Sequence, residues 1–141
     1  MERHFGKYRG VVADDRDPSG MGRVRVRVPG VLGDGTTAWA MPCVPFAGPG
    51  EGFLAVPAIG SPVWVEFEEG DLHRPIWVGG FWESGAEPPR APRDGLVIAA
   101  GGATIRLEKD RITIRNGRGT GIEIGGDEIR IWGEIGRARR G

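Results

Sequence analysis

Cysteine, histidine and long apolar runs are all scarce in this 141-residue sequence, and each scarcity excludes a class of protein. A single cysteine, Cys43, cannot form a disulfide within the chain. Zinc sites need about four N, S or O ligands at recognisable spacings, which Cys43 and the distant His4 and His73 do not supply. No segment approaches the roughly 20 apolar residues that cross a bilayer. The N-terminal MERHFGKYRG has no apolar signal-peptide core, so we expect synthesis in the cytoplasm without a signal peptide.

Net charge is also absent, because 19 Lys and Arg balance 19 Asp and Glu. A neutral chain has no dominant electrostatic attraction to nucleic acid or anionic lipid. The charge is unevenly spread: residues 1–90 carry 9 basic and 12 acidic side chains, whereas residues 91–141 carry 10 and 7. The first part is thus about −3 and the tail about +3. A solvated mixed surface explains this mild asymmetry better than a binding patch does.

Glycine and proline are plentiful, with 26 and 11 residues, and they separate short alternating segments. Such punctuation is typical of turns in an all-β protein, and no segment has helical periodicity, so we expect no helix. Short strands favour a small closed barrel, because closure removes exposed edges, and an OB-type Greek-key barrel fits best. The expected barrel strands are residues 8–13, 23–28, 38–44, 52–55, 62–67 and 75–81.

The last third of the chain alternates most regularly: LVIAA, ATIRLE, RITIRN, GIEI and EIRIW follow one another within residues 96–132. Period-two alternation predicts strands with one buried face. A sheet must bury its apolar face against another layer, and the rest of the tail offers none. We therefore expect a second copy of the chain to cover it, with a minor sheet packed back on the barrel as the alternative. The expected interface residues are Ile105, Leu107, Ile112, Ile114, Ile122, Ile124, Ile129 and Ile131.

The sequence suggests four parts in order. Residues 1–82 form the barrel, and residues 83–94 (ESGAEPPRAPRD) form a polar linker rich in proline. Residues 95–133 hold the alternating strands. Residues 134–141 form a glycine- and arginine-rich C-terminal tail that we expect to fray.

Four ordered motifs in residues 17–79 carry a resemblance to a known family. They are D-P-x-G-x-G-R-V-x-V at residues 17–26, W-A-x-P at residues 39–42, P-x-x-G-x-x-V-W-V-E-F at residues 57–67 and G-D-x-x-x-P-I-W-x-G at residues 70–79. This stretch resembles the N-terminal OB domain of contractile-tail central spikes. That family includes phage baseplate assembly protein V, the phage hub spike, the type VI secretion spike VgrG and spikes of extracellular injection systems. The tail resembles them by pattern only.

The resemblance implies a non-enzymatic homotrimer, in which three barrels form a collar on a tail hub protein and the tails form a short triple-stranded β-helix or prism. It also implies a conical tip protein at the C-terminal end, transient contact with a target cell envelope, and a place in a virion baseplate or injection particle. The chain departs from larger members because it lacks a lysozyme-like insertion, so no cell-wall hydrolysis is carried over. It also lacks a His-x-His pair near the C-terminus, and a metal held on the threefold axis stays open.

A nucleic-acid-binding OB protein is the alternative function, since such barrels stack bases on aromatic rings. Its best support is the basic strand face formed by Arg23, Arg25 and Arg27. Against it, the barrel segment is net acidic and Trp64 is expected to be in register with core-facing positions. We therefore expect no nucleic acid. The candidate stacking residues are Trp39, Trp64, Trp77 and Trp82.

Three further features are assigned structural roles, and we expect no cofactor. Cys43, in the apolar context MPCVPF, is expected to be a small core residue. The acidic run at residues 66–71 is expected to be a strand end and a charged turn rather than the carboxylate pair of a glycosidase. The glycine-rich residues 117–121 open a strand rather than a helix, so they predict a turn and not a phosphate-binding loop.

Overall fold

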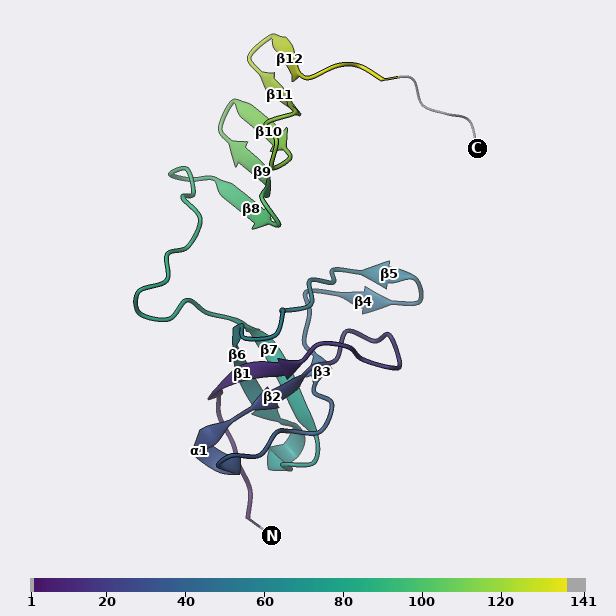
Figure 1. The fold of residues 1–141 in the computed structure, drawn as a ribbon, viewed down its shortest axis with the longest axis vertical. Coiled ribbons are helices and arrows are strands. Elements are labelled where there is room, and N and C mark those ends of the chain that lie inside the picture. Colours follow the sequence, from purple (N-terminus) through teal and green to yellow (C-terminus); the bar gives the residue numbers. More distant parts are fainter. Residues whose placement is uncertain (1, 137–141) are drawn as a thin grey trace. The chain divides into compact units, whose positions relative to one another are not determined.

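The computed structural model describes residues 2–136, and the chain divides into two compact units, Met1–Ala86 and Glu87–Gly141 (Figure 1). The division falls inside the segment 83–94 that the sequence suggests as a linker. Of the predicted C-terminal tail at residues 134–141, residues 137–141 lie outside the described part. Each unit has its own five-stranded sheet.

The first unit is built around a five-stranded sheet in the order β2-β1-β6-β7-β3. The strands are β1 (Tyr8–Asp14), β2 (Arg25–Arg27), β3 (Met41–Pro42), β6 (Pro62–Phe67) and β7 (Pro75–Gly80). The sheet closes on itself because Val24 and Ala40 exchange backbone hydrogen bonds of 3.3 and 2.7 Å, and the Thr37 N–H donates to the Val26 carbonyl at 2.8 Å. The result is a small closed barrel, as the strand pattern predicts.

The barrel core is made of small β-branched side chains. Val24, Val26 and Val28 alternate inward while Arg25 and Arg27 face outward, as the sequence predicts. The interior is tight enough that Gly10 cannot be replaced: a Cβ there would lie 2.4 Å from the Val26 Cγ1 atom. The remaining buried apolar residues are Val12, Ala40, Val63, Val65, Phe67 and Trp77.

The expectation of no helix is wrong for two short turns, α1 (Pro29–Leu32) and η1 (Glu68–Gly70). Pro29 is suited to the first position of α1, because its fixed φ matches a helix start, and Gly33 ends it with a φ of +56°. Elements of three or four residues are too short to show a 3.6-residue period. In residues 2–136, neither helix has the length or apolar character to span a bilayer.

Three predicted barrel strands are also corrected. Residues 23–28 shorten to β2, with Val24 in an isolated bridge to Ala40. Of the predicted strand at residues 52–55, only Gly52 is in a strand. Here β4 (Ala47–Gly48) and β5 (Glu51–Gly52) form a small hairpin, drawn apart from the barrel strands in Figure 1. The predicted strand at residues 38–44 shortens to β3, because only Met41 and Pro42 find ladder partners on β7. Apolar residues that lack a neighbouring strand do not form a ladder, however well they alternate.

The second unit is a five-stranded antiparallel meander in sequential order. Its strands are β8 (Leu96–Ala100), β9 (Ala103–Glu108), β10 (Arg111–Arg115), β11 (Gly121–Gly125) and β12 (Glu128–Trp132). The predicted strands are confirmed to within one residue at each end. Gly101 and Gly102 have φ values of +57° and +82°, as the central residues of a tight hairpin turn require.

Candidate interaction surfaces

The meander gathers its large aliphatic side chains on one face. Each strand contributes two of them, and the strand register aligns them in two rows that cross all five strands. The first row is Leu96, Leu107, Ile112, Ile124 and Ile129, and the second is Ile98, Ile105, Ile114, Ile122 and Ile131. All eight predicted interface residues therefore share this face. Leu96 and Ile98 were missed, although the alternation in LVIAA carried the signal.

This aliphatic face is more exposed than the polar face behind it, the reverse of a normal sheet. Thr113, on the polar face, is 8% exposed, whereas its neighbour Ile114 is 47% exposed. The polar face is internally paired: Arg130 forms an ion pair with Glu128 at 2.9 Å, and the Arg115 guanidinium lies 3.9 Å from the Trp132 ring centroid. Polar groups are therefore satisfied within the chain, and the apolar groups are not.

Burial of the exposed aliphatic rows would contribute a large stabilising free energy. Complete burial of one Leu or Ile side chain is worth about 1.5–3 kcal/mol. Since these side chains are roughly half buried already, the two rows leave on the order of 10 kcal/mol per chain that only a covering layer can recover. Exposed apolar patches of this extent mark interaction surfaces in soluble proteins.

In the barrel, the D-P-x-G-x-G-R motif folds around the carboxylate of Asp17. Its oxygens accept hydrogen bonds from the backbone N–H groups of Ser19 (3.0 Å), Met21 (2.9 Å) and Arg23 (3.2 Å). The Arg23 guanidinium donates to the same carboxylate at 2.8 and 3.1 Å, and the Asp17 side chain is 4% exposed. These bonds hold the loop in one conformation.

The same loop is tied to a second motif 55 residues later. The Trp77 indole N–H donates to the Gly22 carbonyl at 3.0 Å, and Trp77 is 6% exposed within the core. Gly22 has a φ of +73°, which favours glycine, and a Cβ there would lie 2.6 Å from Leu54 Cδ1. The Trp77–Gly22 hydrogen bond thus joins the motifs at residues 17–26 and 70–79 into one structural unit.

We predict that Asp17→Asn weakens the barrel in a pH-dependent way. Hydrogen bonds from Arg23 hold the pKa of Asp17 well below its usual range against the opposing effect of burial, and the backbone bonds lower it further. Because the folded-state pKa is depressed, the stabilisation is complete above the usual carboxyl range near 4 and is lost as the pH falls below it. Urea unfolding followed by tryptophan fluorescence should show a difference between wild type and variant that is largest at pH 7. A difference unchanged at pH 3 would contradict the assignment.

The outer face of the barrel carries an arginine held against two aromatic rings. The Arg9 guanidinium carbon lies 5.2 Å from the Trp64 ring centroid and 4.9 Å from that of Phe81. The two rings pack on each other with centroids 4.5 Å apart. Arg9 on β1 and Trp64 on β6 are direct cross-strand partners, so the strand register itself creates the stack.

A second stack lies on the neighbouring strand. The guanidinium carbons of Arg25 and Arg23 lie 5.5 and 5.8 Å from the Trp39 ring centroid. Arg23 is paired with Asp17. By contrast, among residues 2–136 no carboxylate lies within ion-pair distance of Arg9, Arg25 or Arg27. We call the surface of Arg9, Arg25, Arg27, Trp39, Trp64 and Phe81 the arginine–aromatic face.

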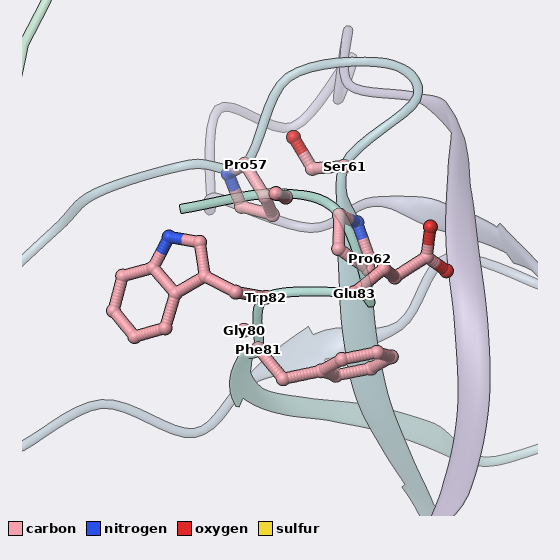
Figure 2. A pocket seen from close by; sticks show the side chains of 8 residues that line it. Pro57, Ser61, Pro62, Gly80, Phe81, Trp82 and Glu83 are labelled. Atoms are coloured by element: carbon pink, nitrogen blue, oxygen red, sulfur yellow. The ribbon is translucent and has the colours of Figure 1, made fainter. Parts of the chain in front are cut away.

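An apolar hollow of about 500 Å³ adjoins this face (Figure 2). Pro57, Pro62, Phe81 and Trp82 supply its apolar walls, and Glu83 lies at the same hollow. In Figure 2 the rings of Phe81 and Trp82 point in different directions from adjacent positions. Phe81 therefore belongs both to the hollow and to the Arg9 stack, which makes the two features continuous.

The β4–β5 hairpin presents a second group of exposed apolar residues. Phe46, Phe53 and Leu54 are between 49% and 61% exposed, and together with Met21 they surround a smaller hollow of about 180 Å³. A two-stranded hairpin is marginally stable alone. The β4–β5 hairpin therefore has apolar surface that does not pack against the barrel core.

Two of the predicted residue environments are wrong. Trp64 does not face the core: Val63, Val65 and Phe67 do, and period-two alternation places Trp64 on the opposite, outer face. The buried tryptophan is Trp77. Cys43 is exposed rather than buried. Its backbone N–H still donates to the Trp77 carbonyl on β7 at 2.9 Å, but the alternation that begins at buried Ala40 turns the Cys43 side chain outward.

The remaining sequence features have the predicted structural roles. In residues 66–71, Glu66 lies one residue before the end of β6 and pairs with Lys7 at 2.6 Å, and η1 forms the charged turn. Residues 117–121 join β10 to β11, where the Asn116 side chain accepts two backbone hydrogen bonds that shape the loop. Within the described range 2–136, no cluster of three His, Cys, Asp or Glu side chains is arranged to hold a metal ion.

The closed barrel, the hydrogen-bonded link between its two motifs and the uncovered aliphatic face define an all-β protein with surfaces suited to assembly. Comparison with known families shows that residues 8–82 match the type VI secretion system/phage-baseplate injector OB domain. The chain belongs to this family, and the predicted OB-type barrel is confirmed. Membership indicates a structural role in a phage baseplate or secretion apparatus and gives no support to nucleic-acid binding. A search of curated proteins finds no match.

Proposed function

We propose that the protein is the central spike, or the base of the spike, of a contractile tail or injection system. The observation that carries the proposal is the pair of aliphatic rows beside a family-matched OB barrel. In this proposal three copies bring their aliphatic faces together around one axis. The rows then form the interior of a prism, and the charged rows form its surface.

The shape of the aliphatic face supports three copies rather than two. Each strand contributes only two aliphatic positions, about 7 Å apart along the strand, whereas five strands extend the rows over about 19 Å. A face so narrow and long suits one side of a triangular prism. A face-to-face sandwich of two sheets normally uses wider surfaces.

The proposed role is mechanical and non-enzymatic. Sheath contraction would drive the tube, and the rigid prism would concentrate that force on a small area of the target envelope. Rigidity would come from hydrogen bonds between neighbouring strands and from the buried aliphatic interior. The proposed partners are a hub protein bound to the barrels and a conical tip protein beyond Trp132, within a baseplate or injection particle.

The direct test is the absolute mass of the full chain in solution, measured by light scattering after gel filtration. We expect three times the 15.2 kDa chain mass, constant over a wide dilution range. A stable monomer would contradict the proposal. A stable dimer would instead favour two sheets packed face to face, and the prism would have to be abandoned.

A further inference from the structure

We infer that the arginine–aromatic face and the adjoining hollow bind a partner protein through an apolar side chain flanked by carboxylates. The inference rests on the proposed function in one respect: the partner is taken to be another protein of the same apparatus. The surface itself is defined by the barrel alone. The step from surface to ligand follows from charge, side-chain order and the shape of the hollow.

Charge is the first argument. Arg9, Arg25 and Arg27 point outward from the adjacent strands β1 and β2, and Arg27 is opposite Val11, two residues from Arg9. Two acids neighbour these arginines in the register, and both have other partners. Asp14, opposite Arg25, accepts the Arg16 N–H, and Glu66, two residues from Trp64 on β6, pairs with Lys7 at 2.6 Å. Three guanidiniums without ion-pair partners within residues 2–136 leave their donor edges available to incoming carboxylates.

Side-chain order is the second argument. Two of the three guanidiniums lie over aromatic rings, Arg9 over Trp64 and Phe81 and Arg25 over Trp39, and these contacts restrain them. A restrained arginine loses less entropy on binding, and its planar fork suits bidentate contact with a carboxylate. Arginine and tryptophan also dominate the energetic centres of protein interfaces. The arginine–aromatic face is rich in arginine and tryptophan, whereas the outer positions of strands normally carry scattered polar residues.

The hollow supplies the third argument. This open hollow of about 500 Å³ has apolar walls formed by Pro57, Pro62, Phe81 and Trp82, and it has room for one large apolar side chain. Because Phe81 also contacts Arg9, an anchor seated in the hollow brings its neighbouring residues to the arginines. Glu83 at the hollow disfavours a carboxylate on that side. The acids should therefore lie on the Arg9 side of the anchor.

A polyanion fits this face less well than a protein does. Residues 1–90 have a net charge of −3, and nucleic-acid binding relies on a basic surface that neutralises many phosphates. Three arginines are enough to pair with a few carboxylates on a partner protein. They are too few to neutralise the many phosphates of a nucleic acid, and the domain around them is acidic.

The test is selection from a random-peptide display library against the full-length protein. We expect enriched peptides to carry Leu, Phe or Trp beside Asp or Glu. Calorimetry on one enriched peptide should show binding at least about tenfold weaker for the variant Arg9→Glu/Arg25→Glu/Arg27→Glu. The matched control, Arg93→Glu/Lys109→Glu/Arg118→Glu, changes net charge equally at exposed sites in the other unit and should bind like wild type. Trp82→Ser should weaken binding without changing its salt dependence.

Several outcomes would overturn the inference. They are enrichment without acidic residues, full binding by the Arg9/Arg25/Arg27 variant, or tighter binding of an oligothymidylate than of any peptide. If circular dichroism shows that the charge-reversal variant is unfolded, the variant Arg9→Gln/Arg25→Gln/Arg27→Gln is used instead, and the same loss of binding is expected. The solution mass separates the two proposals. A monomeric wild type that still selects acidic peptides refutes the spike alone, whereas a charge reversal that lowers the mass makes this face a self-interface and refutes the inference.

Discussion

Replacing Ile112 and Ile114 with Asp should convert the assembly into monomers of 15.2 kDa. The two residues lie on the central strand of the meander, one in each aliphatic row. In a threefold prism the double substitution would bring six carboxylates to the apolar interior. Each buried, unpaired charge costs several kcal/mol, which together exceed the gain from covering the rows. Light scattering measures the mass, and tryptophan fluorescence shows whether the barrel stays folded.

The matched control for this prediction is Ile135→Asp. Ile135 is 82% exposed and lies beyond β12, outside both rows, so the same chemical change there should leave the mass unaltered. If the Ile112/Ile114 variant keeps the wild-type mass, the aliphatic face is not the interface. Loss of assembly in the control as well would mean that any added negative charge disrupts it.

Replacing Trp77 with Ala should be the most damaging single change in the barrel. The substitution removes a large core side chain, which typically costs about 3–5 kcal/mol. It also leaves the Gly22 carbonyl without the indole N–H that it accepts at 3.0 Å. Small domains have about 5–15 kcal/mol of total stability, so the barrel should unfold at a much lower denaturant concentration. Circular dichroism during guanidinium titration measures this midpoint.

Two other variants make the Trp77 result interpretable. Trp82→Ala removes the same side chain at a position that is 62% exposed, and it should change the free energy of unfolding by less than about 1 kcal/mol. Trp77→Phe keeps an aromatic ring but loses the N–H donor, so its cost should fall between the other two. Equal losses at Trp77 and Trp82 would show that the loop–core link is unimportant.

The meander was predictable because local rules fix it completely. Alternation identifies the strands, and two-residue turns such as Gly101-Gly102 fix the register of three of the four hairpins; a longer loop shaped by Asn116 joins β10 to β11. Once the register is fixed, both aliphatic rows follow. The barrel is different, because its sheet joins strands far apart in sequence, as in the parallel pair of β3 with β7. The length of each barrel strand depends on its pairing partner, which cannot be identified from the local sequence.

The errors in the barrel have two distinct causes. Trp64 lies between the buried Val63 and Val65, so strict alternation places it on the outer face although its side chain is largely apolar. The link from Trp77 to Gly22 spans 55 residues and leaves no local signal. Arg9 was likewise passed over, since its stacking partners Trp64 and Phe81 become neighbours only through strand pairing.

The sequential order of the meander has a consequence for length. Every strand pairs only with the strands before and after it in the chain. Duplicating or deleting one hairpin of about a dozen residues therefore adds or removes two strands, or about 10 Å, without altering any other pairing. Reach and cross-section are thus set independently: the two aliphatic positions per strand determine the width, and the number of hairpins determines how far the unit extends. Evolution or design can therefore lengthen such a unit by adding hairpins, without redesigning the existing strands.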